Sequence, residues 1–162
     1  MGKGQHVGMA DAILVKHPGK LVSLGLGSCI GLVLYDEVAK IAAMAHIMLP
    51  ESREGKDNPK PGKFADTAVP LLLDMLLKAG AKRDRIKAKM AGGAQMFNVP
   101  GSKSGFLAVG SRNSEETEKQ LAKSGIKLVA SDTGGNKGRS VEFSTDNWVL
   151  EIKTLGTGKQ GI

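Results

Sequence analysis

Two adjacent apolar runs, residues 29–35 and 40–48, constrain the fold more than any other feature of this sequence. Each run has the length of a β-strand, and neither alternates regularly with polar residues. A strand that is apolar on both faces is covered on both sides by other layers of the structure. We therefore expect these two strands to be fully buried.

The rest of the chain adds helices and further strands. Leucines recur at helical spacing from about residue 66, and Gly80 is a good terminator for that helix. Asn113 and Glu116 resemble a capping box, which predicts a second helix over 114–124. Further strands are predicted at 21–24, 86–91, 106–109, 126–131, 139–144 and 148–153. Two helices and at least seven strands favour an α+β fold with sheet layers covered by helices.

Length and composition limit the class of protein. A chain of 162 residues is enough for one domain, and we expect flexible ends at about 1–5 and 156–162. A single cysteine allows no intrachain disulfide, and no apolar run is long enough to cross a membrane, so we expect a cytoplasmic protein. The net charge of +7 indicates either a generally basic surface or an acidic partner.

The hairpin formed by the two apolar runs brings a cysteine and a histidine together. If Tyr35 pairs with Lys40 across the connecting turn, Cys29 lies directly opposite His46. Directly opposed side chains on one sheet face have Cβ atoms about 4.5–5.5 Å apart. A shift of one residue would place the two side chains on opposite faces. The predicted hairpin therefore forms a Cys–His pair.

Such a pair suits nucleophilic catalysis. The thiolate is the nucleophile, and a neighbouring imidazole lowers the thiol pKa below its usual value of about 8.5. The glycine-rich turn before Cys29, which includes Gly27 and Ser28, can direct backbone N–H groups at one point, as an oxyanion hole requires. The Ser23 hydroxyl is a candidate acceptor for the other N–H of the His46 imidazole.

Other interpretations of the same residues remain open. A lone cysteine in an apolar strand is usually an inert core residue, and His46 is equally consistent with a buried histidine whose hydrogen bonds are satisfied. Ser28 is an alternative nucleophile, although nothing marks it beyond its neighbours. The segment from Gly25 fails the dinucleotide-binding pattern because Ile30 replaces the third glycine. No Cys/His spacing suits zinc, and we expect no metal and no cofactor.

Several short motifs, in order, resemble those of the CheD family of bacterial and archaeal chemotaxis. The first two contain the Cys–His pair, and the resemblance extends over roughly residues 7–153. The motifs are SLGLGSC at 23–29, AHIMLP at 45–50, GKFADTA at 62–68, AGGA at 91–94 followed by Met96-Phe97, Gly110 with Arg112-Asn113, and DTGGN at 132–136 followed by Gly138-Arg139-Ser140. Each motif is short, but their joint order is specific.

The resemblance implies a fold and a set of functional residues. The fold would be two packed mixed β-sheets flanked by helices, in the order α/β/β/α, similar to the deamidase domain of cytotoxic necrotising factor. The family's Cys–His–Thr triad falls on Cys29, His46 and Ser23, so serine replaces the usual threonine. Phe64 stands where the family often has tyrosine. The motifs also suggest a substrate or partner rim, for which the candidates are Gly92, Gly93, Arg112, Asn113, Asn136 and Arg139.

The resemblance also implies an activity and partners. The expected reaction is hydrolytic deamidation of glutamine side chains on the cytoplasmic helices of a chemoreceptor, with hydrolysis of receptor methyl esters as a second activity. The CheC phosphatase is an expected partner. A non-catalytic module that regulates CheC is the alternative, with Cys29 inert. A nucleic-acid-binding domain is disfavoured, because one Trp and one Tyr offer little surface for base stacking.

Overall fold

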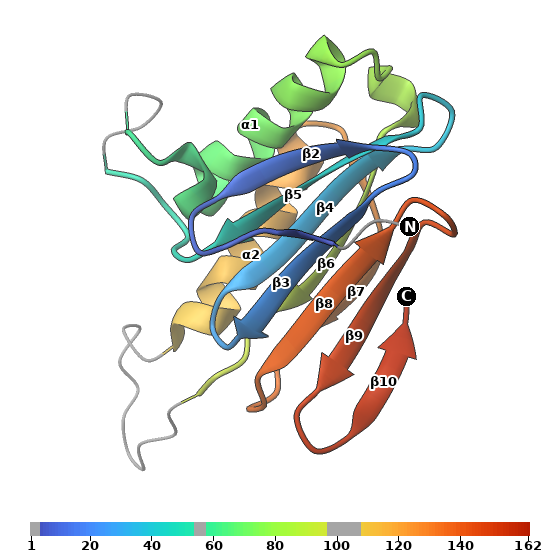
Figure 1. Cartoon of the computed structure of the whole chain (residues 1–162). Coiled ribbons are helices and arrows are strands. Elements are labelled where there is room, and N and C mark those ends of the chain that lie inside the picture. The colour runs from blue at the N-terminus through green and yellow to red at the C-terminus, as the bar shows by residue number, and fades with distance from the viewer. Residues whose placement is uncertain (1–3, 54–57, 97–107) are drawn as a thin grey trace.

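Two five-stranded sheets pack face to face in a computed structural model that describes residues 4–53, 58–96 and 108–162 (Figure 1). Each sheet has one parallel pair, β1 with β3 and β6 with β7, so both sheets are mixed, as expected. Sheet A contains, in spatial order, β1 (Gln5–His6), β3 (Lys20–Leu26), β8 (Arg139–Ser144), β9 (Val149–Thr154) and β10 (Gly158–Gly161). Sheet B contains β2 (Ala12–Lys16), β5 (Ile41–Ile47), β4 (Ile30–Asp36), β6 (Lys87–Gly92) and β7 (Lys127–Thr133).

Both helices of the described chain, α1 (Ala65–Lys78) and α2 (Val109–Lys123), cover sheet B (Figure 1). Two packed mixed sheets flanked by helices confirm the predicted fold class. The expected fourth layer is wrong, because no helix in the described residues lies outside sheet A. Sheet A needs no such cover, since β8 and β9 alternate buried apolar residues with polar residues that face solvent.

The two apolar runs form the central strands of sheet B, and every residue of β4 and β5 is buried, as predicted. Ile30, Leu32 and Leu34 of β4 point toward the helices, whereas Val33 and Tyr35 point into the core between the two sheets. Burial on both faces explains why these strands lack polar residues at alternate positions. The candidate site lies on this central hairpin, because Cys29 directly precedes β4 and His46 lies on β5.

Several elements differ from the predictions. The pattern missed the short strands β1 and β2, and residues expected to fray near the C-terminus form β10, which pairs with β9. The predicted capping box is wrong, because α2 begins at Val109 and Asn113 lies within the helix. The predicted strand at 106–109 falls partly on residues 106 and 107, outside the described residues, and its last residue begins α2.

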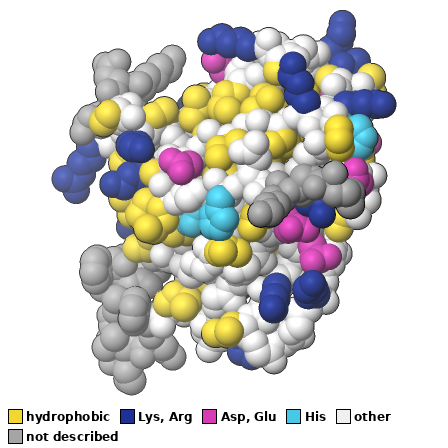
Figure 2. Space-filling view, in the orientation of Figure 1, with side chains coloured by type: hydrophobic (Ala, Val, Ile, Leu, Met, Phe, Trp, Pro, Cys, Tyr) yellow, Lys and Arg dark blue, Asp and Glu magenta, His cyan; other side chains and the backbone are white. Residues whose placement is uncertain are grey.

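The surface carries no single basic patch on the face drawn in Figure 2, where Lys and Arg side chains are scattered around the margins with apolar side chains between them. Among the described residues, no helix is both long and apolar enough to cross a membrane.

Candidate active site

Cys29 lies where the chain passes from sheet A to sheet B, between the end of β3 and the start of β4. Its side chain is half-buried and packs against the apolar core between the sheets. Burial raises the pKa of the thiol, which is opposite to the lowering expected from the sequence. A thiolate at Cys29 therefore requires a base that removes the proton.

The carbonyl groups of the segment before β4 are all held by hydrogen bonds. The Gly27 oxygen accepts from the Ala94 N–H at 2.9 Å, and the Cys29 oxygen accepts from the Gly93 N–H at 2.9 Å. Between them, the Ser28 oxygen accepts from the Asn113 side-chain amide at 2.8 Å. No described residue accepts a hydrogen bond from the N–H groups of residues 27–29. These N–H groups are therefore candidate donors to a ligand.

Two glycines in the predicted rim allow this close packing. Gly92 and Gly93 both have positive φ angles, 117° and 64°. A Cβ atom at Gly92 would collide with the Cys29 carbonyl oxygen, and one at Gly93 would collide with the Ser114 hydroxyl. The two glycines thus let the segment after β6 lie directly against the cysteine segment.

His46 lies on β5 and is only 3% exposed. Its Nδ1 lies 3.2 Å from the backbone oxygen of Val7. A carbonyl oxygen can only accept, so Nδ1 carries the proton and Nε2 is the unprotonated nitrogen. Burial lowers the pKa of His46, although the Val7 contact and the charge of Asp11 oppose this effect. The imidazole is therefore neutral near pH 7, in the tautomer that leaves Nε2 able to accept a proton.

Ser23 is fully buried on β3 and contacts the same backbone oxygen as His46. Its Oγ donates to Val7 O at 2.8 Å and lies 3.5 Å from the sulfur of Met44. In this geometry Val7 O, rather than the Ser23 hydroxyl, accepts the imidazole N–H. This group has no signal in the sequence, because any residue type supplies a backbone carbonyl and the adjoining strand β1 is only two residues long.

The predicted register of the hairpin is wrong by two positions. His46 pairs with Gly31, so Cys29 is its diagonal neighbour rather than its direct partner. The parity of the register is unchanged, and the two positions remain on the same side of sheet B. In a regular ladder diagonal neighbours have Cα atoms about 7–8 Å apart, and Cys29 lies one residue beyond the last pair of this ladder, Ile30 with Ile47.

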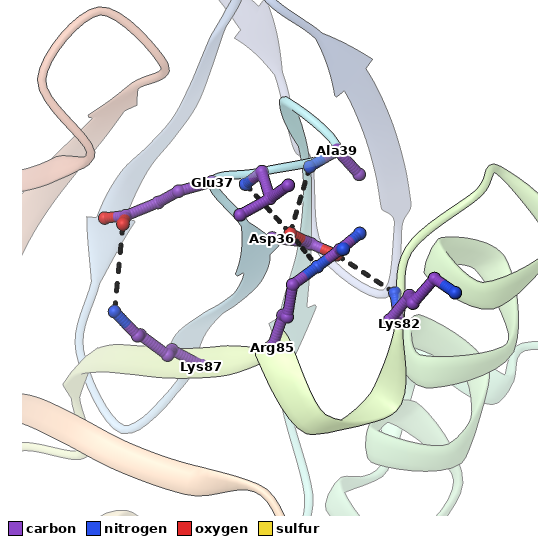
Figure 3. Close-up of polar contacts among 7 residues, drawn as sticks. Asp36, Glu37, Ala39, Lys82, Arg85 and Lys87 are labelled. Atoms are coloured by element: carbon purple, nitrogen blue, oxygen red, sulfur yellow. Dashed lines mark hydrogen bonds and ion pairs between the residues drawn. The ribbon is translucent and has the colours of Figure 1, made fainter.

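The turn of the hairpin explains the shift (Figure 3). The last pair before the turn is Asp36 with Ile41, whereas the sequence predicted Tyr35 with Lys40. Each strand therefore enters the turn one residue later in the chain than predicted. The Asp36 carboxylate accepts hydrogen bonds from the Val38 and Ala39 N–H groups and thereby caps this turn.

Arg139 is buried at the start of β8 and fixes a neighbouring loop. Its guanidinium donates to the backbone oxygens of Asp132 and Gly134, and Nη1 lies 3.4 Å from the Asp132 carboxylate. The loop in turn binds the segment after β6, because Gly135 O accepts from the Gln95 N–H at 2.8 Å. Asn136 is exposed on this loop. Residues 27–29, 92–95 and 132–136 therefore form adjacent segments.

The other two residues predicted to bind a substrate or partner, Arg112 and Asn113, both lie on α2. Arg112 is exposed on α2 and lines a surface hollow with Leu49 and Glu51. Asn113 is fully buried, so its side chain has no surface to offer a partner. Within the described ranges, no group of three or more His, Cys, Asp or Glu side chains is arranged to hold a metal ion.

Comparisons with known proteins all point to one family. The family model described as CheD chemotactic sensory transduction matches residues 48–154. A protein of Clostridium novyi named probable chemoreceptor glutamine deamidase CheD is 47% identical over 156 residues, which cover 96% of each chain. The chemoreceptor glutamine deamidase CheD of Thermotoga maritima is 47% identical over 154 residues, 95% of this chain and 94% of that one. That of Halalkalibacterium halodurans is 48% identical over 157 residues, 96% of each chain.

The family model begins after Cys29 and His46, whereas the matches to whole relatives cover nearly all of the chain and span both residues. Extensive identity over almost the full length, together with the family match, shows that the chain belongs to the CheD family.

Proposed function

We propose that this protein hydrolyses the side-chain amide of glutamine residues on the cytoplasmic helices of a chemoreceptor, which would place its work in the cytoplasm. Its family and the names of its relatives support this substrate. The observation that carries the chemistry is the contact of His46 Nδ1 with Val7 O, which leaves Nε2 as the nitrogen that can accept a proton, on the same side of sheet B as Cys29. A neutral imidazole beside a protonated thiol is the starting state for general-base activation of a nucleophile.

In the first half of the reaction, Cys29 Sγ attacks the carbon of the glutamine carboxamide and His46 Nε2 takes the thiol proton. A carbon–sulfur bond forms, and the amide oxygen gains the negative charge. His46 then gives the proton to the amide nitrogen, the carbon–nitrogen bond breaks, and ammonia leaves. The substrate remains bound to Cys29 as a thioester.

In the second half, His46 removes a proton from water, which attacks the thioester carbon. The carbon–sulfur bond breaks, the proton returns to the Cys29 sulfur, and glutamate is released. Atoms and charge balance without a metal or a redox partner, since each step is an acyl transfer. Ser23 acts indirectly in this mechanism, because its hydroxyl holds the Val7 oxygen that orients the imidazole.

The oxyanion of each tetrahedral intermediate would be bound by backbone N–H groups of Gly27, Ser28 and Cys29. The Gly27 and Ser28 carbonyls are fixed by hydrogen bonds, and each shares a planar peptide unit with the next N–H group, so the N–H groups of Ser28 and Cys29 are oriented before the substrate arrives. A preorganised donor of this kind contributes about 2.7–4 kcal/mol to transition-state stabilisation.

The same acyl chemistry extends to receptor methyl esters, with methanol in place of ammonia as the leaving group. A complex with CheC is proposed on the family's precedent alone. The rival function is a non-catalytic module that binds receptor or CheC through the same surface, with Cys29 as a buried and unreactive thiol. The raised pKa of Cys29 is the observation that favours this rival.

Mass spectrometry of receptor cytoplasmic fragments distinguishes these functions. Fragments are incubated with wild type, with Cys29→Ala and with Ser28→Ala, which removes only the hydroxyl of the alternative nucleophile. We expect specific glutamines to become glutamates with wild type and with Ser28→Ala, and none with Cys29→Ala. If the fragments stay unchanged with wild type and still bind it, the protein is a binding module for these receptors.

A further inference from the structure

Asn113, in the second turn of α2, is fully buried, which is uncommon for a side-chain amide. Its Nδ2 donates two hydrogen bonds, to the backbone oxygen of Ser28 at 2.8 Å and to that of Met48 at 3.0 Å. Both partners are carbonyl oxygens that only accept, so the nitrogen of the amide and not Oδ1 must face them. The side chain is therefore held in one orientation between two backbone segments.

These two segments carry the side chains proposed for catalysis. Ser28 directly precedes Cys29, and Met48 is the second residue after His46. The β4–β5 ladder ends at the pair Ile30 and Ile47, and its register would place Cys29 opposite Met48 if it continued.

The strands instead separate beyond this last pair. In a continued ladder the Leu49 N–H would face the Ser28 oxygen, because hydrogen-bonded pairs recur at every second position; it donates instead to the Lys63 oxygen at 3.1 Å. Asn113 thus bridges the two chains at the place where their backbone hydrogen bonds end.

The first turn of α2 is packed closely enough to make this bridge firm. Gly110 lies so near the backbone oxygens of Gly93 and Ala94 that a Cβ atom would collide with both. Gly93 and Ala94 in turn donate to the Cys29 and Gly27 carbonyls. The helix that carries Asn113 is therefore fixed relative to the cysteine segment by a second, independent set of contacts.

The Asn113 side chain is not fully satisfied. No described residue donates a hydrogen bond to its buried Oδ1. A buried acceptor without a partner lowers stability, and an apolar side chain of similar size would avoid this loss. An apolar side chain, however, would leave the Ser28 and Met48 carbonyls unbridged. The arrangement favours a fixed geometry at the expense of stability.

We propose that Asn113 is a positioning residue that sets the distance between the Cys29 thiol and the His46 imidazole by holding the carbonyls of Ser28 and Met48. This inference rests on the proposed roles of Cys29 and His46. Without the amide, the cysteine segment and the end of β5 are free to move apart, and His46 Nε2 becomes a less efficient base for the thiol.

The test compares Asn113→Ala with Thr117→Val. Thr117 is a matched control, because it is fully buried one turn later on α2 and its hydroxyl donates only to the helix backbone, at Asn113 O. The rate of alkylation by iodoacetamide is measured over a range of pH, and it reports on one thiol because Cys29 is the single cysteine. Thermal unfolding of both variants measures the loss of stability.

We expect Asn113→Ala to slow alkylation near neutral pH by about tenfold or more and to move the midpoint of the pH profile upward. Thr117→Val should change neither quantity. With receptor glutamine as substrate, kcat should fall in Asn113→Ala while KM stays near the wild-type value, since no substrate contact is lost.

An unchanged alkylation profile in Asn113→Ala, with a loss of stability like that of Thr117→Val, would overturn the positioning role. A shifted profile in a protein that converts no receptor glutamine would instead overturn the proposed function and retain the role of Asn113. Should Asn113→Ala not fold, Asn113→Ser replaces it. Its single hydroxyl donor cannot bridge two carbonyls, so the same slower alkylation and upward shift are expected.

Discussion

The two ends of the β4–β5 hairpin are built in contrasting ways. At the turn, the fully buried Asp36 carboxylate accepts hydrogen bonds from the N–H groups of Val38, Ala39 and Lys82 and from Arg85 Nε (Figure 3). At the open end, the strands are bridged by the Asn113 amide, whose Oδ1 has no partner among the described residues.

The turn of the hairpin contributes to stability, whereas its open end carries the groups proposed for chemistry. A buried carboxylate with several donors fixes the turn and the segment of Lys82 and Arg85 that packs against it. At the open end, the groups proposed for acyl transfer, which are the Nε2 of His46 and the N–H groups of residues 27–29, have no hydrogen-bond partner among the described residues. Substitutions at the two ends should therefore affect different measurements.

The largest expected effect is at the open end, on turnover. His46→Asn keeps a side-chain N–H that can donate to Val7 O in place of Nδ1, but it has no base. We expect kcat for receptor glutamine to fall about 10²–10⁴-fold, the usual contribution of a general base. Unfolding by urea should show little change in stability. A variant with wild-type turnover would exclude His46 as the base.

At the turn, Asp36→Ala should act on stability instead. Removal of the carboxylate leaves the N–H groups of Val38, Ala39 and Lys82 without their acceptor, and we expect a loss of about 3–5 kcal/mol in the free energy of unfolding. The rate of Cys29 alkylation should stay unchanged under conditions where the variant is folded.

Glu37→Ala is the matched control for Asp36→Ala. Glu37 follows Asp36 and forms a solvent-exposed ion pair with Lys87, at 3.7 Å (Figure 3). Exposed pairs contribute about 0–1 kcal/mol, so this variant should be nearly as stable as wild type. Equal losses in the two variants would contradict the structural role assigned to the Asp36 carboxylate.

The two ends should also respond to acid in separate ranges of pH. Burial lowers the pKa of His46 below its ordinary 6.5, so the unfolded chain binds a proton before the folded chain does. The contribution of neutral His46 to stability is complete above about pH 6.5 and is lost as pH falls through the lowered pKa. Urea unfolding at a series of pH values should therefore show a decline below about 6.5 that His46→Asn reduces.

Asp36 titrates in a lower range. Burial alone would raise its pKa, but the hydrogen bonds from Ala39, Lys82, Arg85 and Val38 outweigh burial and hold the pKa below 3.8. Its contribution is present above pH 3.8 and is lost as pH falls through the lowered value. Asp36→Ala should leave the decline below pH 6.5 intact, and loss of that decline in this variant would contradict the assignment to His46.

The sequence predicted the central hairpin because its signal is local. The continuous apolar runs identify β4 and β5 as buried strands, and the parity of their spacing places Cys29 and His46 on one side. The register itself was wrong because contacts distant in sequence help to set it. Asp36 binds Lys82 and Arg85, which lie more than forty residues away.

The groups that orient the site carried no comparable signal. Val7 acts through its backbone oxygen, which any residue type would supply. Asn113 looked like a helix cap because it precedes a helical pattern and Glu116 follows it at the right spacing. The helix begins earlier, where Gly110 fits against the backbone after β6, and this tertiary contact outweighs the local preference for an Asn cap.

The smallest expected effect at the open end is at Ser23, the third residue of the predicted triad. Its hydroxyl donates a hydrogen bond to Val7 O, and the His46 Nδ1 donates to the same oxygen. In Ser23→Ala the imidazole keeps its acceptor, so we expect a loss of about 1 kcal/mol in stability and at most a few-fold reduction of kcat. If kcat instead falls as far as in His46→Asn, the hydroxyl must contact the imidazole directly during turnover, and the open end would then depend on a side chain where the structure shows a backbone carbonyl.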